Sequence, residues 1–381
     1  MSSPQIPVHK GLEDIYVKES KICYIDGERS KLFYRGYDID DLVKYSTFEE
    51  VSYLLLYGKL PNRKELNEFQ KSIRDSYTLN PEVIKLLEIF RRDTHPMDLL
   101  RTCISYLSTF DDSPKDQSLE KNLSRVIKII GSIPTILGTF DRIRRGKKPI
   151  EPNPKLNLAS HFLYLLRGKE PKERDAKIMD TALILHAEHE MNASTFACTV
   201  TASTKSDIYS SITSGIGTLK GPLHGGANEE ALRMFLEIGS IDKVKPYLDE
   251  LFVKGKKVMG FGHRIYKNYD PRYRILKEIA KEMSKERGNH KLFEIALKVE
   301  EEVLKRLEKY NIYPNVDFYS GLVFYFLNIP IDFFTCVFTM GRVVGWSAHI
   351  IEYWMDNRLI RPKALYKGEL NLPYKPIEQR E

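Results

Sequence analysis

Cysteine is scarce in this chain, and nothing at its start is built for export. The 381 residues contain four cysteines (Cys23, Cys103, Cys198, Cys336), which are widely spaced and form no CxxC pair. This spacing argues against a disulfide framework and against a structural zinc site, and it favours a reducing compartment. The first seven residues have neither the basic nor the apolar region of a secretory signal. We therefore expect a cytoplasmic protein.

Long apolar runs, sequence repeats and alternating strand–helix patterns are also lacking. The most apolar stretch, residues 322–346, is interrupted by Asn328, Pro330, Asp332 and Arg342, so it predicts buried core helix rather than a membrane span. No βαβ alternation and no repeat of roughly 20–50 residues is evident. Hydrophobic residues make up 42% and charged residues 29%, as in a globular protein long enough for two domains.

Positive charge is in slight excess, with a net charge of +7 and its densest basic run at residues 142–148. Such a run could bind nucleic acid. No aromatic residues are interleaved with it to stack on bases, and the proline-rich residues 149–154 follow it directly. The pattern favours a solvated helix end that leads into a loop, and we expect neither a nucleic-acid nor a membrane partner. A non-catalytic, nucleic-acid-binding helical protein stays open as a remote alternative.

Helical signals dominate the chain. Capping residues predict helix starts at residues 47–50, 62–65 and 80–82. Apolar residues at three- and four-residue spacing predict helices within residues 123–143, 175–202, 229–236, 270–284 and 292–307. One β-hairpin is predicted from residues 21–25 and 31–34, which flank a turn at Asp26 and Gly27.

Two glycine- or proline-containing breaks predict how the chain is divided. Residues 213–222 are rich in glycine, and residues 328–330 interrupt the most apolar stretch. We expect hinges at both places. The prediction is an all-α, two-domain protein: a large helical domain from residues 1–217 and 328–381, and a small inserted helical domain from residues 218–327. The polar segment 367–381 is expected to be extended.

Four segments carry residues suited to catalysis. In residues 260–272, His263 follows two glycines that let backbone amides approach a ligand, and Arg272 comes nine positions later, after an Asp-Pro turn. An arginine can grip a carboxylate with two hydrogen bonds, so the segment suits an anionic substrate with a carbonyl to be polarised. The other candidates, in their segments, are His186 and His189 (186–190), His224 (221–228) and Asp317 (314–321).

Each of these candidates also has a plain structural interpretation. A lone histidine on a helix is more often a core or surface residue, and an aspartate at a helix start is usually a cap. Since His186 and His189 are three residues apart in a helical pattern, we expect them to share a face. Together with His224 and His263 they could bind zinc, with Glu190 as the base of a hydrolase. The spacing is HxxHE rather than HExxH, which changes where the carboxylate points, but this alternative stays open.

Five motifs, in order and over nearly the whole chain, resemble those of the citrate synthase family. They are HAEHEMNAS (186–194), GPLHGGAN (221–228), GFGHRIYKNYDPR (260–272), NVDFYSG (315–321) and GRVVG with IRPKA (341–345, 360–364). The resemblance implies a citrate synthase-like helical fold and a transferase of the tricarboxylic acid cycle. Such an enzyme condenses acetyl-CoA with oxaloacetate and hydrolyses citryl-CoA to citrate and CoA. It also implies a homodimer with shared active sites, and neither a metal nor any other cofactor.

The resemblance assigns roles to individual residues. Asp317 corresponds to the catalytic base, His224 to the residue that hydrogen-bonds the thioester carbonyl, and His263 to the one that polarises the ketone. The residues that match oxaloacetate ligands are His189, Arg272, Arg342 and Arg361. Arg361 corresponds to the arginine contributed by the partner subunit, and Arg358 is the other candidate for that position.

A CoA site is implied around the second glycine motif. Lys267 corresponds to a phosphate-binding arginine of the family, and Lys256 and Arg264 are nearby candidates. Backbone groups suited to the adenine belong to Val258, Met259, Gly260, Phe261 and Gly262. Phe318 and Tyr319 stand where the family often has Ala-His, which leaves acyl selectivity open. A 2-methylcitrate synthase that uses propionyl-CoA is therefore the nearer alternative.

The proposed chemistry explains why these residue types are needed. A carboxylate removes a proton from an acetyl methyl group only in a dry site, where a placed donor meets the developing enolate oxygen. His224 precedes a predicted helix start, and the helix dipole disfavours an imidazolium there, so we expect a neutral donor. Arginines from both domains would close the cleft around oxaloacetate.

Overall fold

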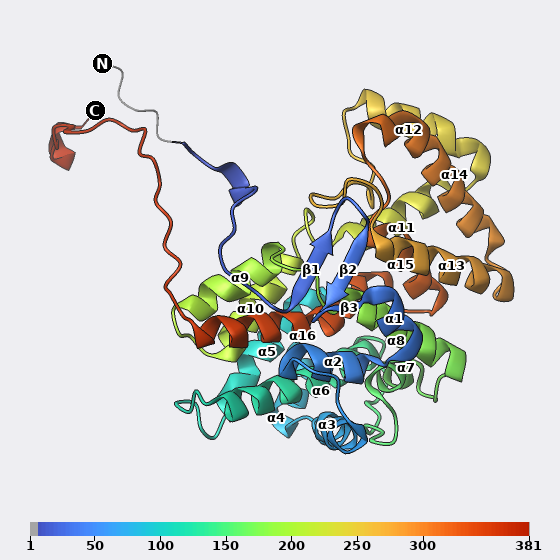
Figure 1. Ribbon diagram of the computed structural model, residues 1–381, viewed down its shortest axis with the longest axis horizontal. Helices are drawn as coiled ribbons and strands as arrows, with labels where there is room; N and C mark the ends of the chain where they lie inside the picture. Colours follow the sequence, from blue (N-terminus) through green and yellow to red (C-terminus); the bar gives the residue numbers. More distant parts are fainter. Residues whose placement is uncertain (1–6, 381) are drawn as a thin grey trace.

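The computed structural model describes residues 7–380, and Figure 1 presents it in ribbon form. Residues 1–6, which hold most of the segment inspected for a secretory signal, and Glu381 lie outside the described residues. In the described part, the elements are sixteen α-helices, six short 3₁₀ helices and one small sheet, so the predicted all-α class is confirmed.

The elements follow one another along the chain without strand–helix alternation. The strands are β1 (Cys23–Asp26), β2 (Lys31–Tyr34) and β3 (Tyr37–Asp38). The helices are α1 (Ile39–Tyr45), α2 (Phe48–Tyr57), α3 (Arg63–Asp75), α4 (Pro81–Ile89), α5 (Pro96–Leu107), α6 (Leu119–Arg144), α7 (Leu158–Arg167), α8 (Glu173–His186), α9 (Ala193–Ser203), α10 (Ile208–Leu219), α11 (Ala227–Ile238), α12 (Val244–Val253), α13 (Pro271–Glu286), α14 (His290–Leu307), α15 (Val316–Phe326) and α16 (Phe334–Met355).

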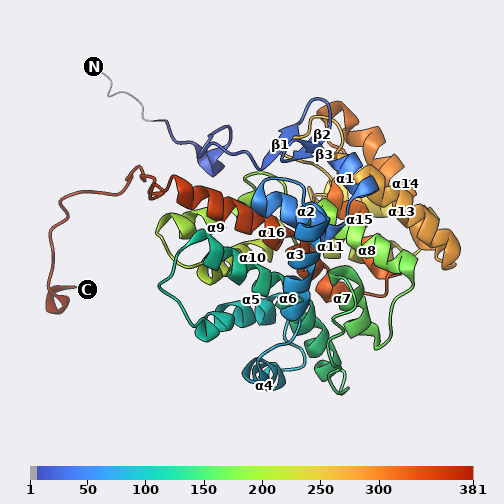
Figure 2. The same ribbon diagram turned by 60° about the horizontal axis from the view of Figure 1, so that its bottom comes forward.

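Helix α16 forms the centre of the larger group of helices. It contacts α2, α5, α6, α8, α9 and α10, and nearly all of its side chains are buried (Figures 1 and 2). Helices α6 and α16 are long and apolar enough to cross a membrane by length and composition, yet most of α6 and all of the apolar part of α16 are buried within the protein. Both are core helices, as the interrupted stretch 322–346 predicted.

Helices α11 to α15 form a second group that packs mainly on itself. The most extensive contacts within it are those of α13 with α15, α11 with α15, and α12 with α14. The group lies to one side of the larger group of helices in both views (Figures 1 and 2). Two contacts with the larger group are α11 with α16 and α13 with α8. The chain enters the group after α10 and leaves it at the break between α15 and α16, where Asn328 has a φ of +58°.

The predicted hinge at residues 213–222 is wrong over residues 213–219, because α10 continues to Leu219. Its glycines serve close packing instead of flexibility. A Cβ on Gly215 would lie 2.4 Å from the Cys198 sulfur and 3.1 Å from the Trp346 ring. Helices α9, α10 and α16 approach one another here only because position 215 has no side chain. The helix ends at Leu219, and the non-helical segment begins after that residue.

The single helix predicted over residues 175–202 is also wrong. Helix α8 ends at His186, and α9 begins at Ala193 with Asn192 as its N-cap, whose side chain accepts from the Ser194 and Thr195 amides. Between them Glu190 has a φ of +55°. His186 and His189 therefore do not share a helix face.

The hairpin and the basic run are found as predicted. Strands β1 and β2 pair antiparallel with Asp26 opposite Lys31, and β3 adds a third strand. Helix α6 ends at Arg144, which forms ion pairs with Asp141 and Asp332, and a loop follows. The C-terminal residues that follow Ile360 extend away from the body on the same side as the N-terminal residues that precede β1 (Figure 1).

Candidate active site

The break between α8 and α9 brings His189 to the loop that carries His263. The rings of His189 and His263 lie 4.9 Å apart between centroids, and His189 Nε2 is 3.1 Å from the hydroxyl of Tyr266. Burial, with the charge of Arg272 next in weight, holds the pKa of His189 well below its usual value. His189 is therefore neutral near pH 7 and available for hydrogen bonding.

The backbone of its own loop orients His263. Its Nδ1 accepts hydrogen bonds from the amides of Ile265 (3.1 Å) and Tyr266 (3.4 Å). Because backbone amides only donate, the proton of the neutral ring is assigned to Nε2. Burial lowers the pKa of His263 to about 4, although Asp270 opposes the shift. A neutral imidazole with a free Nε2–H is suited to polarise a carbonyl.

Arg272 is fully engaged along one edge by Asp270. Its Nε and Nη2 donate to the two carboxylate oxygens at 2.9 and 2.7 Å, and both side chains are buried. Burial raises the pKa of Asp270, but the charge and hydrogen bonds of Arg272 outweigh it and keep that pKa below its ordinary value. Asp270 leaves the Nη1 edge of the guanidinium unengaged. Asp270 also accepts from the Val316 amide at 3.2 Å, which ties Arg272 to the start of α15.

Asp317 is not the cap of its helix, so its carboxylate is free. The side chain of Asn315 caps α15 by accepting from the Asp317 amide at 2.9 Å. Oδ1 of Asp317 is buried without a hydrogen-bond partner. Burial, opposed mainly by Arg272, raises the pKa of Asp317 to about 7. A carboxylate with this pKa can accept a proton near neutral pH.

The second glycine motif joins the His263 loop to the Asp317 helix. The Asn315 amide donates to the Gly260 carbonyl (2.9 Å), and the Gly262 amide donates to the Tyr313 carbonyl (2.9 Å). Gly260 has a φ of +79°, and a Cβ there would lie 2.8 Å from the Cα of Phe318. Only glycine allows this approach, which brings the loop and the helix start together.

His224 is set to donate from Nδ1. Its Nε2 lies 3.3 Å from the Ser194 amide nitrogen, which can only donate, and 2.8 Å from the Ser194 hydroxyl. The proton of the neutral ring is therefore assigned to Nδ1. The pKa of His224 is lowered to about 4, by burial first and by Arg342 second. His224 precedes α11 as predicted, but burial is the main cause of its neutrality.

Arg342 and His186 lie in the core beside the site. Arg342 is buried on α16, donates from Nε to the His186 carbonyl at 2.8 Å, and lies over the Phe338 ring. The ring of His186 packs near Phe324 and Phe338, and its Nδ1 is 2.7 Å from the Ala182 carbonyl. His186 is thus a core histidine, and its backbone carbonyl helps to position Arg342.

The residues predicted to bind CoA lie along the segment that leads to His263. Lys256, Arg264 and Lys267 are exposed, as phosphate contacts require. Lys267 forms an ion pair with Glu28 at 2.9 Å. The Gly260 and Gly262 carbonyls each accept one hydrogen bond from Asn315, so Val258, Met259 and Phe261 offer the less engaged backbone carbonyls for an adenine.

Arg361 is not brought to this site. Ser194 contacts His224 at one end of α9, and Ser203 contacts the Ile360 amide at the other end (3.1 Å). Nine residues of helix separate them by about 14 Å. Arg358 and Arg361 both lie in the exposed segment after α16.

The predicted four-histidine zinc set is not gathered as a cluster. Among the described residues, the group with metal-ligand atoms close together is His189, His263 and Asp270, within 4.8 Å of one another. Both oxygens of Asp270 already accept from Arg272, so the carboxylate has little capacity left for a cation. His186 is held in the core.

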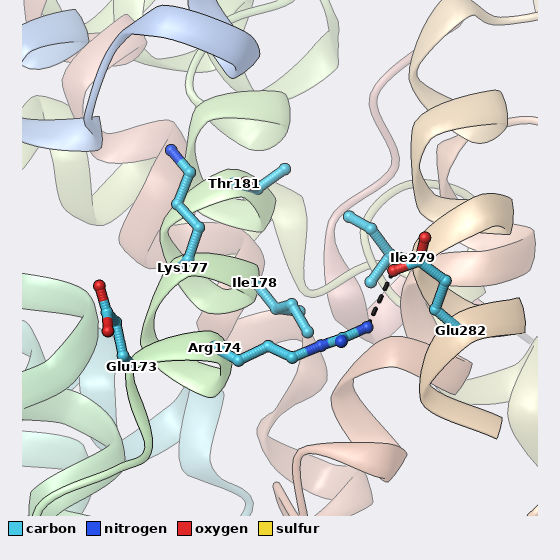
Figure 3. Close-up of a pocket in the computed structure, with 7 residues that line it drawn as sticks. All are labelled: Glu173, Arg174, Lys177, Ile178, Thr181, Ile279 and Glu282. Atoms are coloured by element: carbon cyan, nitrogen blue, oxygen red, sulfur yellow. Dashed lines mark hydrogen bonds and ion pairs between the residues drawn. The ribbon is translucent and has the colours of Figure 1, made fainter. Parts of the chain in front are cut away.

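A separate groove lies between α8 and α13, at the boundary of the two helix groups (Figure 3). Its volume is about 460 Å³, and Arg174 crosses it to form an ion pair with Glu282 at 2.8 Å. None of the predicted site residues lines it. The residues that line it are Glu173, Arg174, Lys177, Ile178, Thr181, Ile279 and Glu282.

Several residues that contact the candidate site residues were not predicted from the sequence. Tyr266 and Asp270 stand inside the 260–272 motif, and Ser194 ends the HAEHEMNAS motif, so motif membership was the available signal. Their hydrogen-bond partners are remote in sequence or set by loop shape. Trp346, which donates to the Ser194 hydroxyl at 3.1 Å, had no such signal.

Comparisons with known proteins agree on one family. The family described as citrate synthase, C-terminal domain, matches residues 11–363. The citrate synthase of Synechocystis sp. is 43% identical over 371 residues, covering 97% of this chain and 94% of the relative. A citrate/2-methylcitrate synthase of Bacillus subtilis is 38% identical over 359 residues, covering 94% and 96%.

A solved structure extends the likeness to the fold. It is the ternary complex of carboxymethyl coenzyme A and oxaloacetate with citrate synthase from the thermophilic archaeon Thermoplasma acidophilum. The two chains are 36% identical with a TM-score of 0.95, and the match covers 98% of this chain and 100% of the other.

Proposed function

The chain belongs to the citrate synthase family, and we propose that Asp317, His224 and His263 carry out its condensation of acetyl-CoA with oxaloacetate. The main support for these roles is the burial of the Asp317 carboxylate and its raised pKa. Its buried oxygen has no partner and its pKa is about 7, while the pKa values of both histidines are near 4. One base and two neutral donors are thus ready at the same pH.

Each group has one task in the reaction. Asp317 removes a proton from the acetyl methyl group, and the Nδ1–H of His224 stabilises the enolate oxygen. The enol carbon forms a bond to the ketone carbon of oxaloacetate, and the Nε2–H of His263 meets the growing alkoxide. Water then cleaves the citryl thioester to release citrate and CoA.

Oxaloacetate is held by charges from both helix groups. The Nη1 edge of Arg272 and the guanidinium of Arg342 would bind its carboxylates, with His189 as a further donor. The bound oxaloacetate and CoA analogue of the Thermoplasma acidophilum relative support this choice of substrates. The proposed steps need neither a metal nor any other cofactor, because protein groups supply the base and all donors.

Acetyl-CoA is the proposed acyl substrate, with propionyl-CoA as the alternative. Phe318 and Tyr319, where the sequence departs from the family, are fully buried; Phe318 packs on Phe235 and Phe261, and the Tyr319 hydroxyl bonds Glu300. Both side chains point into the α11–α15 group. The departure therefore gives no reason to prefer the longer acyl chain.

Oxaloacetate-dependent release of CoA thiol tests the proposal, with acetyl-CoA and propionyl-CoA in parallel and EDTA present. Turnover that survives EDTA and is lost in Asp317→Ala is expected, with acetyl-CoA the faster thioester. Loss of turnover with EDTA would favour the zinc hydrolase instead. A folded protein that releases no thiol would contradict the function and leave the nucleic-acid-binding alternative, which Arg144→Ala would then test.

A homodimer with shared sites in the cytoplasm is part of the proposal. The position of Arg361, about one α9 length from its own site, supports a site completed by a partner subunit. Exposed apolar side chains on the two terminal segments, including Tyr16, Leu370 and Tyr374, suit a partner surface. The cytoplasmic location rests on the small number and wide spacing of the cysteines, which favour a reducing compartment.

A further inference from the structure

The turn between β1 and β2 docks on the loop that follows His263. The Lys267 amide donates to the Gly27 carbonyl at 3.0 Å, and Asn268 Nδ2 donates to the Glu28 carbonyl at 2.8 Å. Both Figures 1 and 2 show the small sheet beside the loops of the α11–α15 group. The contact joins segments that are about 240 residues apart.

Gly27 allows the two backbones to meet. A Cβ on Gly27 would lie 2.2 Å from the carbonyl oxygen of Ile265 and 3.0 Å from its carbonyl carbon. The atom in the way is backbone, so it cannot rotate aside as a side chain would. Any side chain at position 27 forces the turn and the loop apart.

The loop held in this way sets the catalytic ring. The Ile265 and Tyr266 amides that bond Nδ1 of His263 belong to the same loop, and the Tyr266 hydroxyl contacts His189. A shift of Ile265 therefore moves the donors that fix the orientation and the protonated nitrogen of His263. Displacements of about 1 Å can cost about 100-fold in rate.

The exposed ion pair between Glu28 and Lys267 is not the main tie. Both side chains are largely exposed, at 77% and 67%, and exposed pairs contribute little to stability. The backbone contacts are independent of these side chains. The contact between the turn and the loop would therefore persist if the Lys267 side chain left Glu28 to bind a phosphate.

We propose that the β1–β2 turn is a clamp in which Gly27 and Asn268 act as positioning residues for His263. The turn fixes residues 265–268, and that loop fixes the imidazole for the ketone. This inference rests on the proposed role of His263. It assigns to the N-terminal hairpin a part in the reaction, although the hairpin contributes none of the predicted catalytic residues.

The test compares Gly27→Ala, Asn268→Ala and the double variant with Arg29→Ala. Arg29 is in the same turn, is exposed, and forms only a 3.9 Å contact with Asp26. We expect kcat to fall about 10- to 100-fold in Gly27→Ala and less in Asn268→Ala, with a smaller change in the KM for oxaloacetate. Arg29→Ala should keep the wild-type kcat. Both substitutions disrupt the same contact between the turn and the loop, so the double variant should be no slower than Gly27→Ala.

Hydrogen exchange of the backbone amides in residues 260–272 supplies a readout that needs no activity. Exchange at Lys267 should quicken in Gly27→Ala and Asn268→Ala and stay unchanged in Arg29→Ala. A lower thermal midpoint with unchanged kcat would overturn the inference, and so would unchanged exchange at Lys267. If Gly27→Ala does not fold, Asn268→Ala decides by the same two measurements.

A wild-type protein that releases no thiol would contradict the proposed function instead. The exchange measurement would still decide whether the turn holds the loop. The two failures are therefore distinguishable.

Discussion

Asp317 makes the reaction sensitive to pH. Its pKa of about 7 lies far above the ordinary value because burial outweighs the nearby arginines, whereas His224 and His263 have pKa values of about 4. The base works only when deprotonated, so kcat should rise about tenfold per pH unit below pH 7 and level off above it. The histidines stay neutral over this range. A kcat that is flat between about pH 5.5 and pH 8.5, with an intact fold throughout, would contradict the assignment.

The same burial should make Asp317 costly for stability. Its folded pKa is raised, so its favourable contribution is complete below the unfolded value and is lost as pH rises through about 7. Asp317→Asn should therefore stabilise the fold at about pH 8, by up to about 4 kcal/mol, while turnover falls about 10³-fold. The gain should vanish below about pH 4.

Thermal and denaturant unfolding at both pH values measure this gain. Asp41→Asn is the matched control, because Asp41 is exposed in the first turn of α1 and should show neither effect. An Asp317→Asn protein that is no more stable than the wild type at the higher pH would mean that the carboxylate is well solvated.

The sequence predicts the residues of the site better than their partners. His224, His263 and Asp317 stand out by motif, yet the prediction that an aspartate at a helix start is a cap misses that Asn315 takes that role. The pairing of Arg272 with Asp270 was equally open to inspection, since both belong to one motif. What the sequence does not contain is burial. The pKa values of His189 and Asp317 depend on it, and it comes from helices remote in the chain.

At the scale of elements, local signals predict starts and turns, and tertiary packing decides the rest. The capping box at Asn62 and the hairpin around Gly27 are local, and both are found. The break between α8 and α9 contains neither glycine nor proline, so the sequence carries no local breaker there, and Glu190 takes the positive φ of +55° that glycine adopts more readily. The glycines of α10 suggested a flexible segment, but Gly215 is needed where α9 and α16 press on that helix. Glycine has two uses, and only the packing tells which one applies.

At the scale of the whole molecule, the two helix groups would supply opposite sides of the proposed site. Arg272 lies in the first turn of α13 in the smaller group, and Arg342 lies on α16 in the larger one. We expect oxaloacetate to draw the groups together and reduce the radius of gyration in small-angle scattering, because it binds both arginines best in a closed form. Arg272→Ala should abolish the change. A radius that oxaloacetate leaves unaltered in the wild type would contradict closure.

The assembly is tested by mixing two inactive chains. Arg361 directly follows Ile360, which contacts the far end of α9. In the proposed dimer, Arg361 completes the partner's site, while Asp317 acts within its own subunit. Asp317→Ala and Arg361→Ala chains should each be nearly inactive alone. In a mixed dimer one site regains both residues, so unfolding and refolding an equal mixture should restore about a quarter of wild-type activity if chains pair at random.

Two further variants sharpen this experiment. Lys363→Ala, two residues along the same exposed segment, should be active alone and need no rescue. Arg358→Ala takes the place of Arg361→Ala in a second mixture, and rescue only there would mean that Arg358 crosses to the partner. A mixture that regains nothing with either arginine variant, although both chains fold and dimerise, would show that each subunit carries a complete site. The extended segment after α16 would then serve only to hold the subunits together.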